Sequence, residues 1–186
     1  MQVLALFRPL PAEPEAPRPP GRELSQRTTE LLQEAMLRQG LEPWTPERNA
    51  LGAPQPRDGW HVSKSHCPTM VAAALAPCPV GIDVEALRWS QVAEWQRVAS
   101  EPERQLFEPY DTLAFTRLWT AKEALLKWLG VGVAGLSGCR VRSNPSPTSL
   151  ELIHGERSWL VEQRIEQGHV LSLCVEHPGS ISWALA

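Results

Sequence analysis

Apolar side chains between positions 22 and 39 recur at intervals that place them on one face of a helix. They are Leu24, Leu31, Leu32, Met36 and Leu37. Gly40 follows at the point where a helix stop is expected. The pattern therefore predicts an amphipathic helix over Arg22–Gln39.

Shorter apolar runs in the first part of the chain predict strands. They cover Met1–Phe7, Trp60–Ser63 and Val71–Leu75, and we expect a turn at Ser65 and His66 between the last two. Nearly every residue of Val71–Leu75 is apolar, which is typical of a strand buried on both faces. The intervening segments are rich in proline or glycine and predict irregular connections.

The second part of the chain begins with a strand over Pro79–Val84 and contains a long amphipathic helix over Asp111–Leu129, with shorter helical segments between Ala86 and Phe107. Short strand-like runs follow after Gly132. These runs are Cys139–Arg142, Leu150–Ile153, Trp159–Ile165, Val170–Val175 and Ile181–Leu185. We predict that they form an antiparallel meander on the long helix, which gives an α+β fold.

Composition excludes several classes of protein. The formal net charge of the 186 residues is −3, whereas a protein that binds nucleic-acid backbones needs a strongly basic face. The four cysteines show no CxxC spacing, so neither a zinc knuckle nor a redox pair is indicated. Met1–Phe7 is too short for a signal-peptide core, and no window is long enough to span a bilayer. We expect a cytoplasmic protein that binds neither nucleic acid nor a membrane.

Two carboxylates at alternate positions of the strand before residue 86 are the first candidates for chemistry. Because the apolar residues of that strand occupy the other positions, Asp83 and Glu85 are expected to point together to the opposite face. Neighbouring carboxylates repel each other unless a cation joins them. Glu123 on the long helix would supply a third oxygen ligand, and such a set suits Mg²⁺ that is shared with substrate phosphates.

Lys122 and Lys127 lie on the same helix as Glu123 and could hold phosphate oxygens. Each motif also has a simpler interpretation. Acidic residues at alternate strand positions often face water, and Glu123 with Lys127 is an i,i+4 ion pair worth roughly 0.2–0.5 kcal/mol. Either motif alone favours the structural interpretation, but the two together favour a site.

These residues resemble a known family. GIDVE at 81–85 followed by WTAKEALLK at 119–127 resembles the paired signature of the 4′-phosphopantetheinyl transferases. Ser65 and His66 resemble the Ser-His of that family's Ser-His-Ser/Thr segment, and SEPE at 100–103 resembles its Phe-Ser-x-x-Glu segment. The motifs occur in the family's order, and the specific part of the resemblance covers Asp58–Arg142.

The resemblance is to the two-half, surfactin-synthetase-activating type, and it implies a pseudo-duplicated α+β fold with the active site between the halves. We expect a shortened N-terminal half over residues 1–79 and a C-terminal half over residues 80–186 that carries the metal motifs. This form is usually monomeric. Pro9–Gly21 stands where family members carry a longer helical region, Ala53 replaces an expected lysine, and Cys67 replaces a hydroxyl. These departures concern the coenzyme A pocket.

The activity that the resemblance implies is that of a holo-[acyl-carrier-protein] synthase. Such an enzyme transfers 4′-phosphopantetheine from coenzyme A to a serine of an apo acyl or peptidyl carrier protein and releases adenosine 3′,5′-bisphosphate. Asp83, Glu85 and Glu123 would bind Mg²⁺. One alternative is a coenzyme A-binding homologue without transferase activity, and another is an interaction domain in which the motifs are solvated ion pairs.

The resemblance also assigns roles to the remaining candidates. Ser65, His66, Lys122 and Lys127 would bind coenzyme A, Lys127 would also act in catalysis, and Glu103 would be the general base. Glu103 has an alternative explanation, because Ser-x-x-Glu before a helix is also a capping box that needs no catalysis.

Overall fold

The computed structural model describes residues 2–11, 20–87, 92–176 and 180–186. The elements in chain order are β1 (Gln2–Pro9), α1 (Gly21–Arg38), β2 (His61–Cys67), β3 (Met70–Ala76), β4 (Val80–Ala86), α2 (Val92–Val98), α3 (Glu101–Gln105), α4 (Thr112–Leu129), the 3₁₀ helix η1 (Gly132–Gly138), β5 (Cys139–Ser146), β6 (Ser149–His154), β7 (Arg157–Glu166), β8 (His169–Val175) and β9 (Ser180–Leu185).

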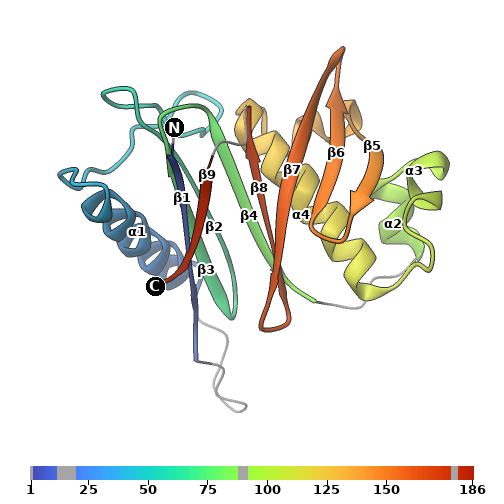
Figure 1. The fold of residues 1–186 in the computed structure, drawn as a ribbon, viewed down its shortest axis with the longest axis horizontal. Coiled ribbons are helices and arrows are strands. Elements are labelled where there is room, and N and C mark those ends of the chain that lie inside the picture. Colours follow the sequence, from blue (N-terminus) through green and yellow to red (C-terminus); the bar gives the residue numbers. More distant parts are fainter. Residues whose placement is uncertain (1, 12–19, 88–91, 177–179) are drawn as a thin grey trace.

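These elements stack in four layers, α1, a first sheet, a second sheet and α4. Figure 1 shows α1 at the left, then the first sheet and then the second sheet, with α4 crossing it and packed against it. The first sheet has the strand order β2-β3-β1-β9, and the second has the order β4-β8-β7-β6-β5. The buried apolar residues of the described chain form one cluster under α1, one between the two sheets and one under α4. The arrangement confirms the predicted α+β class, whereas the pseudo-duplication stays a prediction.

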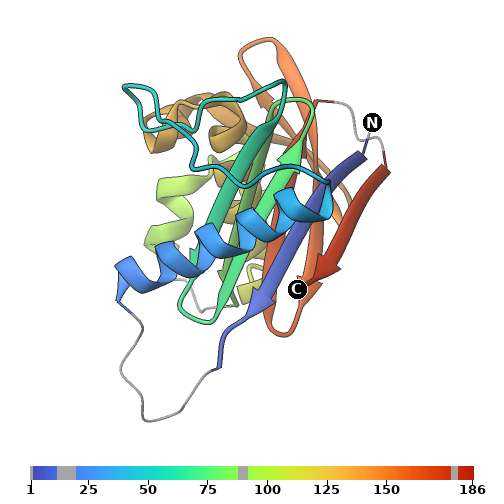
Figure 2. The same ribbon diagram turned by 90° about the vertical axis from the view of Figure 1, so that its left-hand side faces the viewer.

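The helix α1 forms where the apolar pattern predicts it and crosses one face of the first sheet (Figure 2). Leu31, Leu32 and Met36 are buried in the cluster that joins α1 to this sheet. Leu37 departs from the prediction, because its side chain is 61% exposed. It lies at the edge of the apolar stripe, where a regular helix turns the side chain away from the sheet.

The sequence predicts a turn at Ser65 and His66, and this prediction is wrong. Both lie within β2, and the turn to β3 falls at Pro68 and Thr69. The polar residues of β2 hid the true length of the strand, because one face of β2 contacts polar groups of β4. The fully apolar strand β3 is buried throughout, as predicted.

The last predicted strand does not join the meander. Strands β5 to β8 form it as expected, and β4 extends it, but β9 pairs in parallel with β1, with Val3 opposite Ile181. Ile181 and Trp183 pack against the cluster between the sheets, so burial of their side chains stabilises this pairing. The predicted boundary between the two halves, at residues 79 and 80, stays a prediction. The first sheet contains β9, which lies on the C-terminal side of that boundary.

The helix α4 begins and ends where the sequence predicts. The side chain of Asp111 accepts a hydrogen bond from Ala114 N at 2.7 Å, which caps the first turn. Gly130 ends the helix in the left-handed conformation, with φ of 69°. Among the described helices, none is long and apolar enough to cross a membrane.

Candidate active site

The helix α4 lies against β4 at a distance that only glycine permits. A Cβ atom on Gly81 would lie 2.0 Å from Ala124 O and 2.6 Å from Trp128 N, both of which are backbone atoms of α4. A larger residue would therefore push the helix away from the strand. Asp83 follows Gly81 on the same face of β4, so the close approach brings its carboxylate to the charged residues of α4.

Asp83 is the centre of a small hydrogen-bonded group. Its Oδ1 accepts a hydrogen bond from Ser65 Oγ at 2.6 Å and one from Lys127 Nζ at 2.6 Å. The ammonium of Lys127 also donates to Ser65 Oγ at 2.9 Å and to Ile82 O at 3.1 Å. Three elements, β2, β4 and α4, therefore meet at this carboxylate, and the structure brings together three of the residues that the sequence suggested.

Two carboxylate oxygens beside this group have no partner among the described residues. Asp83 Oδ2 and Glu123 Oε1 are both buried, and neither accepts a hydrogen bond. Burial raises the pKa of Glu123, and the charge of Asp83 raises it further, although Lys127 acts in the opposite direction. Buried carboxylate oxygens without donors are costly unless a cation or proton reaches them. Hard oxygen ligands of this kind fit Mg²⁺, which accepts further oxygens from water or phosphate.

Glu85, the third predicted metal ligand, is half-buried on the same strand. Within the described ranges, no three or more histidine, cysteine, aspartate or glutamate side chains gather closely enough to hold a metal ion. The complete triad with Glu85 therefore stays a prediction. Asp83 and Glu123 still fit a divalent cation, because each has a buried carboxylate oxygen without a partner among the described residues.

Lys122 and Glu103 form a separate ion pair under α4. The two side chains are 2% and 6% exposed, and Lys122 Nζ lies 2.6 Å from Glu103 Oε1. Glu103 also accepts hydrogen bonds from Ser100 N and Val141 N, each at 2.8 Å. Burial alone would raise the pKa of Glu103, but the hydrogen bonds from Lys122 and from the backbone outweigh it and lower that pKa. The predicted roles of these two residues in catalysis and coenzyme A binding stay predictions.

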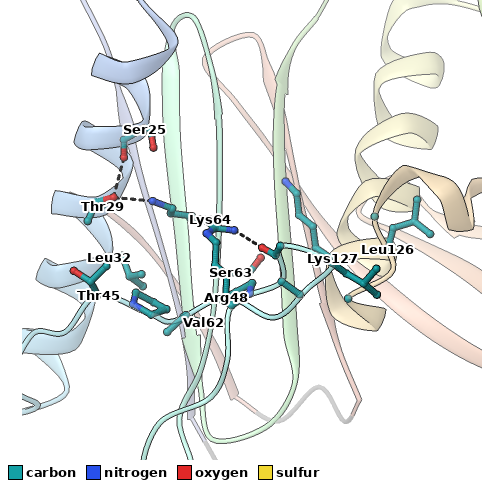
Figure 3. Close-up of a pocket in the computed structure, with 17 residues that line it drawn as sticks. Ser25, Thr29, Leu32, Thr45, Arg48, Val62, Ser63, Lys64, Leu126 and Lys127 are labelled. Carbon is teal, nitrogen blue, oxygen red and sulfur yellow. Dashed lines mark hydrogen bonds between the residues drawn. The ribbon is translucent and has the colours of Figure 1, made fainter.

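A pocket of about 350 Å³ opens between α1, the loop after it, β2 and the end of α4 (Figure 3). Arg48, Lys64 and Lys127 line it, and none of the described lining residues is acidic. Lys64 Nζ donates to Thr29 Oγ1 of α1 at 2.7 Å. Burial lowers the pKa of Lys64, and the nearby charge of Arg48 lowers it further. Three cations around one pocket favour an anionic ligand.

Ser65 and His66 are not among the residues that line this pocket. Ser65 reaches the site through Lys127 and Asp83 instead. His66 is exposed, and burial of part of its ring together with Lys127 and Lys64 lowers its pKa, although its own backbone and Asp83 act the other way. Contact of either residue with a phosphate stays a prediction.

Sequence reasoning missed two cations of the pocket and the glycine that positions the site. Lys64 could have been found from the alternation of β2, since it must point to the face opposite Ser65 and hence toward α1. Arg48 lies in an irregular loop and carries no periodic signal. Gly81 was part of a recognised motif, but its close contact with α4 depends on the tertiary structure.

The fold and the site together define an α+β protein with a cationic pocket next to paired acidic residues, a class suited to a phosphate-bearing ligand and a divalent cation. The family model described as the 4′-phosphopantetheinyl transferase superfamily matches residues 79–174, which include β4, α4 and the acidic residues. The chain belongs to this superfamily.

A similar protein is the 4′-phosphopantetheinyl transferase psf-1 of Bacillus pumilus. It is 31% identical over 134 residues, which cover 65% of this chain and 55% of that relative. This chain thus spans little more than half the length of that relative.

Proposed function

We propose that this protein transfers the 4′-phosphopantetheine arm of coenzyme A to a serine hydroxyl of an apo acyl or peptidyl carrier protein. Membership of the superfamily supports transfer of a 4′-phosphopantetheinyl group, and psf-1 is named as a transferase of this group. The observation that carries the proposal is the pair of unpartnered carboxylate oxygens of Asp83 and Glu123, because Lys127, which lines the cationic pocket, also donates a hydrogen bond to the other oxygen of Asp83.

The pocket residues would bind and orient coenzyme A. Arg48 and Lys64 provide positive charge for its phosphate groups between α1 and β2. Lys127 lies at the boundary between the pocket and the carboxylates, and its side chain is 29% exposed, so its ammonium can reach a bound pyrophosphate. Ser65 holds Asp83 through a hydrogen bond to Oδ1, which leaves Oδ2 directed elsewhere.

Asp83 and Glu123 would hold Mg²⁺, with Glu85 as a further ligand, and the bound ion would offset the negative charge of the pyrophosphate. The reaction forms a bond between the serine oxygen and the phosphorus that carries the pantetheine arm. The bond between that phosphorus and the bridging oxygen breaks, and adenosine 3′,5′-bisphosphate leaves. The hydroxyl proton passes to a base or to water. Lys127 would stabilise the charge that develops on the phosphate oxygens.

The test is a transfer assay with purified protein, coenzyme A, Mg²⁺ and a panel of apo carrier domains from fatty-acid, polyketide and peptide synthesis. We expect a mass increase of about 340 Da, the formula mass of the arm, on at least one carrier, and its loss when the metal is chelated. A carrier whose acceptor serine is replaced by alanine is the control and should not change in mass.

Two results would contradict the proposal. Tight coenzyme A binding without transfer to any carrier of the panel would indicate a homologue that has lost the activity. Absence of both binding and transfer would favour an interaction domain in which the charged residues are structural ion pairs.

A further inference from the structure

The buried pair of Glu103 and Lys122 has its hydrogen-bonding capacity taken up by other protein groups. Glu103 Oε1 accepts hydrogen bonds from Lys122 Nζ at 2.6 Å and from Val141 N at 2.8 Å. Its Oε2 accepts from Ser100 N at 2.8 Å and from Ser100 Oγ at 2.7 Å. Two carboxylate oxygens offer about four acceptor positions, so these contacts fill the carboxylate.

Lys122 is equally engaged. Its ammonium donates to Val98 O at 2.6 Å as well as to Glu103, and the whole residue is only 1% exposed. Neither Lys122 nor Glu103 is among the residues that line the cationic pocket. Either residue would have to break several short hydrogen bonds in a buried environment to reach a phosphate or a carrier serine, and such groups are expensive to leave unpaired.

The contacts of the pair instead connect four elements. Val98 ends α2, Glu103 lies in α3, Val141 lies in β5, and Lys122 lies in α4. Lys122 precedes Glu123 directly in the helix. A displacement of this turn of α4 would move Glu123 relative to Asp83, since Asp83 is fixed on β4 and held by Ser65 and Lys127.

We propose that Glu103 and Lys122 are positioning residues, which lock α2, α3 and β5 onto α4 and thereby fix Glu123 opposite Asp83, without transferring a proton or binding phosphate. This inference rests on the proposed function, because it assigns Glu123 to a divalent cation. It replaces the predicted base role of Glu103 and the predicted phosphate contact of Lys122.

The test is a double variant, Glu103→Leu with Lys122→Met, which removes both charges and leaves no buried ion unpaired. Mn²⁺ binding in the absence of coenzyme A is measured by electron paramagnetic resonance, and transfer is measured over a range of metal concentrations. We expect Mn²⁺ to bind roughly 10–100-fold more weakly, as is usual when groups that orient metal ligands are lost. The transfer rate at saturating metal should stay within about threefold of the parent, because a positioning role leaves the chemical step intact.

Two results would overturn the proposal. A base role for Glu103 predicts unchanged Mn²⁺ affinity and a loss of roughly 10²–10⁴-fold in rate even at saturating metal. A purely structural role predicts neither change. Glu101→Gln is the matched control: Glu101 lies in the same helix but is exposed and pairs with Arg104, so both readouts should stay at the parent level.

If the double variant does not fold, Glu103→Gln decides the question, because its amide oxygen can still accept two of the four hydrogen bonds that Glu103 accepts, such as those from Lys122 and Val141, while the carboxylate that could take a proton is gone. Weakened Mn²⁺ binding with a normal rate at saturating metal supports the proposal, and any loss above about tenfold at saturation contradicts it. The Mn²⁺ measurement does not require transfer. A parent protein that binds Mn²⁺ but modifies no carrier would therefore count against the proposed function and leave the positioning role to be judged by metal affinity.

Discussion

The helix α4 carries two lysines that each lie 2.6 Å from a buried carboxylate, and the two pairs differ in the exposure of the lysine and in the hydrogen bonds of the carboxylate. In the pair of Lys122 and Glu103, every carboxylate oxygen has a donor and the lysine side chain is 2% exposed. In the pair of Lys127 and Asp83, the lysine side chain is 29% exposed and Asp83 Oδ2 has no partner among the described residues.

The difference shows that the distance between a lysine ammonium and a carboxylate oxygen does not separate a structural ion pair from a candidate functional one. What separates the two pairs is the hydrogen-bonding capacity that remains unused. A saturated pair stabilises one arrangement of its elements, whereas the unpartnered buried oxygens of Asp83 and Glu123 leave acceptor positions for the cation that we propose.

The largest effect should come from removing a carboxylate at the unsaturated site. We expect Glu123→Gln or Asp83→Asn to reduce transfer by at least on the order of 10²–10³-fold, because each weakens charge neutralisation at the pyrophosphate. The fold should be retained, since the substitution also removes a buried charge. Transfer rates and urea midpoints of both variants check this. Near-normal metal-dependent transfer in either variant would refute the metal site.

Gly81→Ala should have the next largest effect. The added Cβ would meet backbone atoms of Ala124 and Trp128, which cannot move without the helix. We expect a loss of roughly 1–3 kcal/mol in the free energy of unfolding, as in other overpacked sites, together with reduced transfer. Gly21→Ala is the control, because a Cβ there meets nothing within 4 Å. Equal stability of the two variants would show that α4 does not depend on this contact.

Removal of one pocket cation should have a smaller, selective effect. Lys64→Met should raise the dissociation constant of coenzyme A roughly tenfold, the size of one charge-assisted hydrogen bond, and leave the rate at saturation nearly unchanged. Calorimetric titration measures this directly. Arg27→Met is the control, because Arg27 is exposed on α1 and pairs with Glu23. Similar losses in both variants would indicate a diffuse electrostatic effect instead of a pocket contact.

The smallest expected effect is on the pH dependence of stability in metal-free protein, where the two glutamates should act in opposite directions. The pKa of Glu103 is lowered from 4.5, so its favourable contribution is present above that value and is lost as the pH falls through its folded pKa. The pKa of Glu123 is raised from 4.5, so an unfavourable contribution develops as the pH rises from 4.5 through its folded pKa.

Urea midpoints measured with a chelator between about pH 3 and about pH 6 test this, with Glu103→Gln and Glu123→Gln as the comparison variants. As the pH rises, the parent should gain stability relative to Glu103→Gln and lose stability relative to Glu123→Gln. Parallel changes in the two variants would show that both glutamates experience the same environment, contrary to the comparison of the two pairs.

Much of the fold can be predicted from the spacing of apolar residues along the chain. In α1, α4 and β3 this spacing alone indicates a helix or a buried strand, and the structure has the same element there. The position of β9 could not be predicted in this way. Its alternating residues indicate a strand, but nothing local shows that β1 is its partner. The length of β2 was equally hidden, because Ser63 and Ser65 look like turn residues in the sequence but form hydrogen bonds with β4 in the fold.

The candidate site was predictable in part. The motifs named Asp83, Glu123 and Lys127, and the structure places them around one point. The contacts of Glu103 with Lys122 could not be read from the sequence, since they join residues 19 positions apart through a buried arrangement of helices. The capping contact of Glu103 with Ser100 N is the one local signal, and it is present.

In the proposed function, the unpartnered oxygens of Asp83 and Glu123 would hold a divalent cation together with the phosphates of a ligand in the cationic pocket. Calorimetric titration of coenzyme A with Mg²⁺ and with a chelator tests it most directly, on the parent and on Glu123→Gln. We expect Mg²⁺ to tighten binding to the parent by about tenfold or more, within the usual range of coupling between sites, and we expect this gain to disappear in the variant. An equal gain from Mg²⁺ in both proteins, or none in the parent, would contradict it.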